Sequence, residues 1–250
     1  MFQNKIYYLV MTIVISVMVG LYIKHKYYTQ RIPKIIIQTW KTDIIPAKYT
    51  QEVNSVKTHH PTYEYLFFTD DAIEIFLETH YHEYYETYKK LPKQIQRIDF
   101  FRYIAVYHYG GFYLDLDIEV HKPFDELLHH TAIFPIDLHI TPFMCDKKYP
   151  RFQKLCKSNQ KIMIGQYAFG AIPQHPFIKE LIDDIHNNID IYIQKFKEDK
   201  SLQYVYETTG PDFVTYKYLD TKPVDITILY HKEGQHFGSY ATHNHYGTWK

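Results

Sequence analysis

The stretch of residues 96–120, QRIDFFRYIAVYHYGGFYLDLDIEV, limits the possible folds of this chain more than any other part of the sequence. Apolar side chains with the i, i+3, i+4 spacing of a helix begin just before it and run through its first half: Ile95, Ile98, Phe101 and Ala105. Gly110-Gly111 then supplies two residues that tolerate positive φ, which end a helix and turn the chain tightly. The pattern predicts a helix over residues 92–109 that leads directly into a short strand, Phe112–Asp117.

Charged side chains lie at the ends of these apolar elements. Asp99 and Arg102 share one face of the helix, where they either present a carboxylate and a guanidinium to one ligand or form an intrahelical pair of little energetic value. Asp115 and Asp117 end the strand, and two hard oxygen ligands at a sheet edge suit Mg²⁺ or Mn²⁺ with positions left for phosphate oxygens. A D-x-D motif is short enough to occur by chance, so an acidic hairpin turn stays open as the alternative.

The preceding residues alternate between strand and helix patterns. Ile35–Ile37 is a continuous apolar run typical of a buried strand, residues 46–58 favour a helix, and residues 63–68 favour a second strand. This order predicts parallel pairing in an α/β sheet, whose ligands lie outside the carboxyl ends of the strands. Trp40 and Asp70 follow those ends, so we expect both near a ligand site.

The second half of the chain has weaker patterns and no internal repeat. We expect one folded domain over residues 32–250, with these further elements: a short helix over 123–129, a strand over 131–140, one long helix over 175–196, a loop over 208–211 that leads into 212–219, and a strand over 226–230.

Residues 1–31 are a different kind of segment. Ile6–Ile23 contains 18 residues without a charge, enough to cross most of a hydrocarbon core about 30 Å thick. We expect a single transmembrane anchor and a short polar stem; a cleaved signal peptide and a buried core helix are the alternatives. Basic residues are more numerous after the apolar run than before it, which on the positive-inside rule would place the domain in the cytosol.

Composition excludes some classes of protein. Lys+Arg and Asp+Glu are both 28, so there is no overall basic field for non-specific nucleic-acid binding. Cys145 and Cys156 are the two cysteines, too few for a disulfide scaffold or a cysteine-rich zinc site, and they form either one disulfide or two free thiols.

Two further residue types are candidate ligand contacts. The indole of Trp40 at a strand end suits stacking on a nucleobase, although tryptophan is more often a core residue. His243 and His245 are two residues apart, so they share a face if the tail forms a strand, and a pair of this kind is usually a surface feature.

Five motifs in one order resemble glycosyltransferase family 32, whose signature is a sugar-binding region with a D-x-D motif. They are IPKIIIQTW at 32–40, P-x-Y-x-Y at 61–65, R-x-D-x-x-R-Y…Y-x-G-G-x-Y-x-D-x-D at 97–117, T-G-P at 209–211 and H-x-x-x-G-T-W at 243–249. That family includes initiating α-1,6-mannosyltransferases and sphingolipid mannosyltransferases. The central run is also similar to the donor site of clostridial glucosylating toxins.

The resemblance implies a GT-A-type, Rossmann-like α/β fold with a mixed sheet and flanking helices, here preceded by the transmembrane helix. It implies retaining transfer of a hexose, foremost mannose from GDP-mannose, to a glycan, glycoprotein or glycolipid acceptor in a Golgi- or ER-type lumen. The implied metal, Mn²⁺ or Mg²⁺, is bound by Asp115, Asp117 and His243. The implied donor-binding residues are Trp40, Asp99, Arg102, Tyr113 and Asp115, and the implied catalytic residues are Asp99, Arg102, Asp115 and Asp117.

The chain departs from the family pattern at Ile37, where histidine is usual, and at Thr248, where serine is usual. The loss of a polar group at Ile37 bears on donor or acceptor choice. A membrane-anchored glycan-binding protein without turnover is one alternative. A D-x-D phosphatase is another, but that motif needs Thr or Val at the position of Glu119, and it lies on the first strand of its fold.

Overall fold

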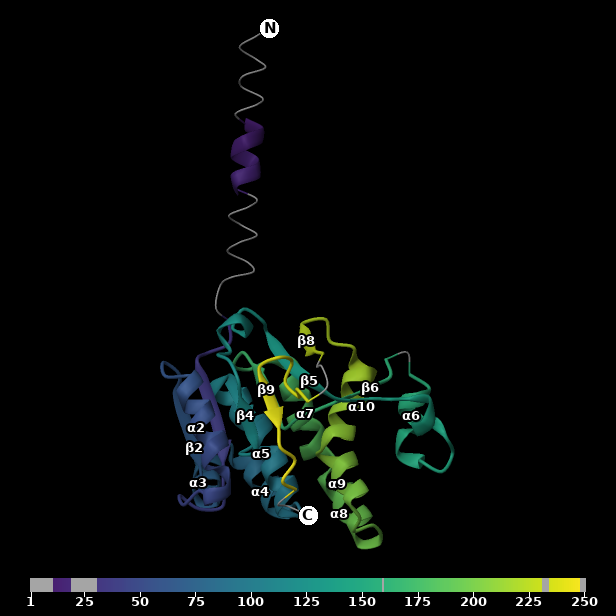
Figure 1. The fold of residues 1–250 in the computed structure, drawn as a ribbon. Helices are drawn as coiled ribbons and strands as arrows, with labels where there is room; N and C mark the ends of the chain where they lie inside the picture. Colours follow the sequence, from purple (N-terminus) through teal and green to yellow (C-terminus); the bar gives the residue numbers. More distant parts are fainter. Residues whose placement is uncertain (1–10, 19–30, 159, 231–233, 248–250) are drawn as a thin grey trace, which may run out of the picture.

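In a computed structural model, described for residues 11–18, 31–158, 160–230 and 234–247, the chain forms a mixed sheet covered by helices (Figure 1). Seven strands of the described part form the main sheet in the order β2-β1-β3-β7-β5-β6, with β8 paired to β5, and β4 and β9 form a small second sheet. The strands are β1 (Ile35–Thr39), β2 (Glu64–Phe68), β3 (Gly111–Leu114), β4 (Ile118–Val120), β5 (Ala132–His139), β6 (Ile162–Ile164), β7 (Ala168–Ala171), β8 (Ile226–Leu229) and β9 (Ala241–His243).

The strands β2, β1 and β3 are mutually parallel, whereas β7 pairs antiparallel with both β3 and β5. The described helices are α2 (Thr50–His59), α3 (Asp70–His80), α4 (His82–Lys90), α5 (Gln94–Tyr109), α6 (Gln153–Cys156), α7 (Pro176–Asn187), α8 (Ile189–Glu198), α9 (Leu202–Thr208) and α10 (Pro211–Thr221). Short 3-10 turns lie at Ala47–Tyr49, Asp125–Leu127, Pro142–Cys145 and Pro150–Phe152.

Two hydrophobic cores cover the two faces of the sheet. Neighbouring residues of one strand belong to different cores because side chains alternate across a strand: Phe112 lies in the core with α2, and Tyr113 in the core with α3, α4, α5 and α7. The predicted parallel α/β beginning is confirmed, including strands at 35–39 and 64–68 and the helix that enters β3.

Helix α5 differs from the prediction of one apolar stripe. Phe101 and Ala105 are buried as expected, but Ile95 and Ile98 are half-buried and line a cleft. From Asp99 to Val106 every residue is buried, because the helix lies against the sheet, α4, α7 and α9 at once.

The predicted long helix over 175–196 is wrong, because two helices, α7 and α8, meet at Asn188. The Asn188 side-chain amide donates to the Asp184 carbonyl (2.8 Å), and such local bonding by asparagine competes with helix continuation. The helices α4 and α9 were not predicted.

Residues 11–18 of the expected anchor are helical, and its other residues and the stem lie outside the described part of the chain. Among the described residues, no helix combines the length and apolar character needed to cross a membrane.

Cys145 and Cys156 form a disulfide, which resolves the alternative left open by the sequence. It closes a loop beyond β5 that carries α6, and Ile140, Leu155 and Met163 form a small core beneath this loop.

Candidate active site

A cleft of about 650 Å³ opens at the carboxyl ends of β1 and β3, where the parallel strands predict a ligand site. Trp40 and Asp70 both line it, as their positions after β1 and β2 suggested. The predicted site residues Asp99, Arg102, Tyr113, Asp115, Asp117 and His243 line the same cleft, so the fold brings together every candidate named from the sequence.

The two glycines before β3 let this strand lie directly against β1. Gly110 and Gly111 have φ of +67° and +83°, a region that favours glycine. A Cβ atom on Gly111 would lie 2.5 Å from the Ile35 carbonyl oxygen, so the parallel pairing that carries Asp115 to the cleft depends on glycine here.

The D-x-D motif lies in a turn after β3 rather than within a strand. The Asp115 carbonyl accepts from the Ile118 amide (3.2 Å), and the Asp115 amide donates to the Tyr167 carbonyl (2.7 Å). Strand β3 therefore ends at Leu114, and both carboxylates of the motif reach the cleft from a turn whose backbone is fixed.

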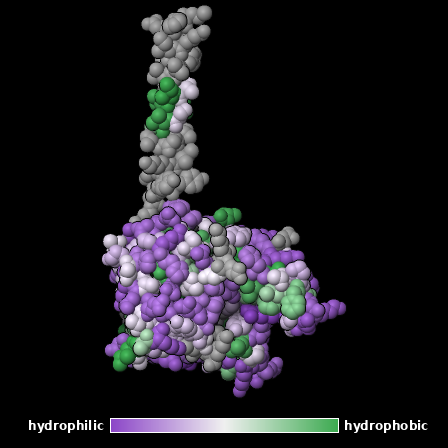
Figure 2. Space-filling model, in the orientation of Figure 1, coloured by the Kyte–Doolittle hydropathy of each residue, from purple (hydrophilic) through white to green (hydrophobic). Residues whose placement is uncertain are grey.

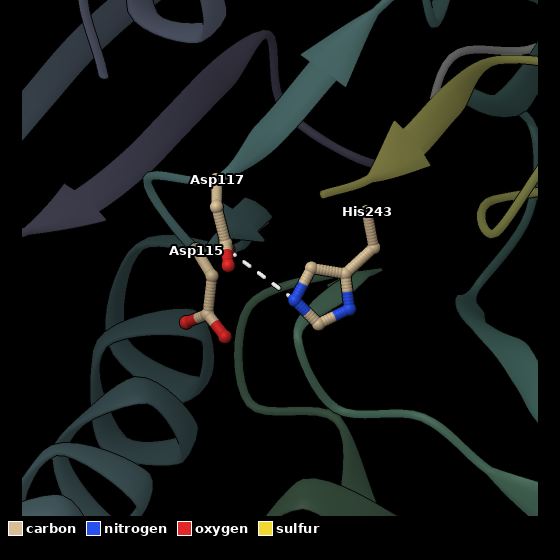
Figure 3. A group of neighbouring side chains, drawn as sticks. All are labelled: Asp115, Asp117 and His243. Atoms are coloured by element: carbon tan, nitrogen blue, oxygen red, sulfur yellow. Dashed lines mark ion pairs between the residues drawn. The ribbon is translucent and has the colours of Figure 1, made fainter. Parts of the chain in front are cut away.

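His243 reaches this turn through strand pairing. Strand β9 pairs antiparallel with β4, which places His243 opposite Ile118, next to the motif. Ligand atoms of Asp115, Asp117 and His243 all lie within 4.8 Å of one another (Figure 3). His243 Nε2 lies 3.3 Å from Asp117 Oδ1. His243 is therefore not part of a surface histidine pair without a role in the cleft, which was the alternative reading of the sequence. The ring centroids of His243 and His245 lie 4.0 Å apart.

The tail after β9 is fastened across the motif. The Asp117 carbonyl accepts from the Asn244 amide (2.9 Å), and its carboxylate accepts from the Tyr246 amide (3.0 Å). The side chains of Asn244 and Tyr246 both donate to Glu52 Oε1 on α2, at 2.8 and 2.6 Å. Glu52 is only 2% exposed, so one buried carboxylate holds the segment that carries His243.

Arg102 lies between two carboxylates. Its Nη2 is 3.2 Å from Asp99 Oδ1 and 3.2 Å from Asp115 Oδ1, and its guanidinium lies over the Tyr113 ring at 4.6 Å. Arg102 and Asp99 are 3% and 1% exposed, so the alternative of a surface helix pair is wrong. This arrangement connects α5 directly to the D-x-D motif.

The acids of the cleft have displaced pKa values. Burial raises the pKa of Asp99 to about 6 against the opposing charge of Arg102. Burial also raises the pKa of Asp115, again opposed by Arg102. Burial acts in the same direction on Asp117, but hydrogen bonding and charge from His243 outweigh it and lower the pKa of Asp117. Asp117 is therefore the stronger anion of the D-x-D pair.

Trp40 is connected to the tail through the ring of Tyr49. Its indole meets the Tyr49 ring edge-on, with centroids 5.2 Å apart, and Tyr49 in turn contacts the Tyr246 ring at 5.7 Å. Trp40 is partly exposed at the cleft wall and also packs against a small core of Tyr49, Val53 and Leu116.

Comparison with known proteins agrees with this geometry. Residues 46–134 match the family described as glycosyltransferase sugar-binding region containing DXD motif. The chain thus contains a glycosyltransferase family domain. The chain is 31% identical to inositol phosphoceramide mannosyltransferase 1 of Schizosaccharomyces pombe over 85% of its residues, and 25% identical to the initiation-specific alpha-1,6-mannosyltransferase of Candida albicans over 74%. It spans only 61% and 49% of the lengths of these two relatives.

The glycosyltransferase domain also has structural neighbours. The PaToxG glycosyltransferase superposes with a TM-score of 0.51 at 16% identity, covering 84% of this chain and 76% of the neighbour. The glycosyltransferase domain of the YGT toxin gives a TM-score of 0.51 at 8% identity, covering 80% of each chain. At these identities the likeness shows the fold, and it confirms the predicted GT-A-type α/β fold with a mixed sheet.

Two residues that hold Asp99 and Arg102 were not predicted from the sequence. Gln166 accepts from Arg102 Nη1 (2.6 Å) and donates to Asp99 (3.1 Å). Thr209 donates to the other Asp99 oxygen (2.8 Å). Thr209 belongs to the T-G-P motif, a signal present in the sequence without a role attached, whereas nothing around Gln166 marked it.

The far end of the cleft has a different chemistry. Arg151, from the disulfide-closed loop, donates through Nε and Nη2 to Asp212, which is fully buried, and lies over the Tyr206 ring at 4.1 Å. Asp137 and the apolar Leu202 line the same end. These residues belong to the part of the chain beyond the family match.

Proposed function

We propose that this chain is a metal-dependent retaining glycosyltransferase that transfers mannose from GDP-mannose to a glycolipid. The observation that carries the proposal is the convergence of Asp115, Asp117 and His243 on one point of the cleft, with Arg102 bound to the same Asp115. A negatively charged diphosphate needs positive charge on both sides, and this cleft offers a cation site and a fixed guanidinium.

The three residues fit a divalent metal ion. Two carboxylates and one imidazole are a donor set that accepts Mn²⁺ or Mg²⁺. The carboxylates come from the turn after β3 and the imidazole from β9, and Arg102 is bound to one of the carboxylates. A bound divalent ion would neutralise charge on the diphosphate leaving group. Among the described residues His243 Nδ1 has no hydrogen-bond partner, so the tail contacts hold the ring mainly through its backbone and through stacking on Tyr167 at 4.3 Å.

The remaining roles follow from position. Arg102 would stabilise the charge that develops on the leaving group, where fixed electrostatics contributes most to rate. Asp99, held by Gln166 and Thr209, would orient Arg102 and accept a hydroxyl of the donor sugar. Tyr113 supports Arg102 from below, and Trp40 would stack on the base. A front-face retaining transfer needs no enzyme base, so orientation of the acceptor hydroxyl would supply much of the remaining rate.

The choice of mannose and of a glycolipid is supported by the names of the relatives, of which the first is an inositol phosphoceramide mannosyltransferase. We further propose that residues 6–23 anchor the protein in a Golgi- or ER-type membrane with the cleft in the lumen, for which a protease-protection assay on sealed membranes is the test.

The decisive experiment incubates the full chain with a panel of nucleotide-sugars and Mn²⁺ and measures release of nucleoside diphosphate. We expect one donor to be consumed, and we expect EDTA or Asp117→Asn to abolish its consumption. Asp71→Asn, at an exposed acid in the first turn of α3, is the matched control and keeps activity. Binding of glycans without turnover, unaffected by EDTA, would favour a glycan-binding protein and contradict the proposal.

A further inference from the structure

The loop beyond β5 has a charge composition unlike the rest of the chain. Residues 141–161 hold six of the 28 basic residues and only one of the 28 acidic ones, so this segment carries five net positive charges in a chain that is neutral overall. The basic residues are Lys147, Lys148, Arg151, Lys154, Lys157 and Lys161. All except Arg151 are exposed, and we call this segment the basic loop.

The described part of the basic loop is closed by a disulfide and attached to the sheet. The Cys145–Cys156 disulfide joins its two sides, and Leu155, fully buried, fastens it to Met163 and Ile140 at the end of the sheet. Lys154 has an acidic neighbour outside the loop, Asp220, at 3.8 Å. The charges are therefore presented on a framework that projects from the β6 edge of the sheet, where α6 lies in Figure 1.

An exposed aromatic side chain lies among the lysines. Phe143 is 64% exposed, its ring contacts Tyr149 at 5.1 Å, and Lys148 lies over both rings at 4.8 and 5.1 Å. The flank that carries α6 shows apolar surface surrounded by hydrophilic surface in Figure 2. Exposed aromatic residues flanked by lysines are typical of segments that enter the interface of an anionic lipid bilayer.

The basic loop also forms one rim of the cleft, through Arg151. The guanidinium of Arg151 is already bound to buried Asp212, so its charge is directed inward and the exposed lysines remain for an outside partner. A partner bound by those lysines would lie beside the far end of the cleft.

We propose that the basic loop docks on an anionic lipid surface, with Phe143 in the interface and Lys147 and Lys148 against the headgroups. Charge complementarity and the exposed aromatic ring carry this inference, which is independent of the proposed transferase activity. Docking at this rim turns the far end of the cleft toward the bilayer, from which a lipid-borne substrate could enter without leaving the membrane.

The test places a reporter at the tip of the basic loop. The full chain with Phe143→Trp is reconstituted into nanodiscs of phosphatidylcholine, with or without phosphatidylserine, and quenching of its fluorescence by brominated acyl chains is measured. The fluorescence of the chain without this substitution, which contains Trp40 and Trp249, is measured in the same discs and subtracted as background. We expect quenching of the added indole in discs that contain phosphatidylserine and little in neutral discs, with a loss at high salt because salt screens exposed charges.

Charge reversal identifies the surface. Lys147→Glu with Lys148→Glu should abolish the quenching, since each basic residue near an anionic membrane contributes about a fivefold change in partitioning. The matched control, Lys89→Glu with Lys90→Glu, reverses two consecutive exposed lysines at the end of α4 and should leave it intact. Equal quenching in neutral discs, none in either disc, or equal loss in the control would overturn the proposal. No donor is present, so failure of the transferase proposal would not alter these outcomes.

Discussion

At the scale of single residues, Arg102 is the connection between the helix and the D-x-D motif. One guanidinium contacts Asp99, Asp115 and Gln166, and it is almost completely buried. A buried charge of this kind is stable only when its partners satisfy it, and here the partners come from α5, the turn after β3 and the loop before β7. The side chain therefore fixes three elements relative to one another.

Arg102→Lys is expected to lower kcat/KM for nucleoside diphosphate release by about 100-fold, because an ammonium keeps the charge but cannot span both carboxylates. The measurement is steady-state kinetics with the donor found active. Arg97→Lys serves as the control, since among the described residues Arg97, on the same helix, donates to the carbonyls of Leu91 and Lys89 and not to a carboxylate. Parental kinetics for Arg102→Lys would exclude Arg102 from the reaction.

The sequence was sufficient to name the charged residues around the D-x-D motif but not their partners. Asp99, Arg102, Asp115 and Asp117 lie in one continuous stretch, so their proximity follows from a single helix–turn–strand unit. Gln166 is 64 residues from Arg102, in a loop of no distinctive composition. Its role depends on the antiparallel pairing of β7 with β3, which local patterns do not specify.

At the scale of elements, the tail around β9 decides whether the site is complete. The pairing of β9 with β4 positions His243, while Glu52 on α2 holds the residues that follow. Phe237 and Ala241 anchor the start of this segment in the hydrophobic core, and we infer that the polar contacts to Glu52 hold the part after His243.

Glu52→Ala is expected to release the tail and weaken activation by Mn²⁺ by about 10-fold or more, because supporting contacts of metal ligands commonly contribute this much. A Mn²⁺ titration of activity, combined with limited proteolysis of the tail, measures both effects. Glu52→Gln, whose amide oxygen still accepts from Asn244 and Tyr246, should recover most of the loss. An unchanged Mn²⁺ response in Glu52→Ala would show that the tail is held by other contacts.

The disulfide is the corresponding fastening of the basic loop. Replacing Cys145 and Cys156 by serine is expected to lower the free energy of unfolding by about 2–3 kcal/mol, the value for closing a loop of this size. Thermal unfolding with and without reductant measures it, and the double-serine variant should not respond to reductant. If reductant did not change the unfolding of the parental chain either, the disulfide would not stabilise the fold.

Element types were predictable where one pattern dominated. The apolar run of β1 is typical of a buried strand, and the Gly-Gly pair before β3 is typical of a tight turn. The break at Asn188 was hidden because apolar spacing continues across it, and only the side-chain bond to Asp184 reveals the interruption. Strand β7 has only four residues, AFGA, and three of them have small side chains or none. Its sequence therefore shows no strand pattern that could be recognised before the neighbouring strands are known.

At the scale of the whole molecule, four histidines that are fully or partly buried link stability to pH. Burial lowers the pKa of His60, His108, His130 and His175 from the usual value of 6.5. His60 shows the reason: its Nδ1 donates to the Val56 carbonyl, and its Nε2 accepts from the Phe124 amide, which only a neutral ring can do. The folded chain therefore resists protonation that the unfolded chain accepts.

Above pH 6.5 these histidines should not affect the free energy of unfolding. Below pH 6.5 the free energy of unfolding should fall as the pH drops, by up to about 1.4 kcal/mol per pH unit for each histidine. The fall ends once the pH is below the pKa of that histidine in the folded chain. Urea unfolding at about pH 7.5 and about pH 5.5 measures the difference. His60→Gln, whose amide oxygen can accept from Phe124, should show a smaller difference. An identical pH response in this variant would remove His60 from the explanation.

The parallel half of the molecule followed from sequence order, and the antiparallel half did not. Strand, helix and strand in succession leave few topologies open for β1, β2 and β3. The strands β5, β6, β7 and β8 join out of sequence order, so their arrangement depends on packing over the whole chain rather than on any one segment.

The pairing of β9 with β4 also has a consequence for how the protein matures. Asp117 and His243 lie 126 positions apart in the sequence, so a chain whose sheet has formed but whose last strand is still loose possesses only the carboxylate half of the ion site. Closing so long a loop is a late event in folding. Uptake of the ion proposed for this site would then mark the final step of folding. Binding of that ion and completion of the fold would be one event.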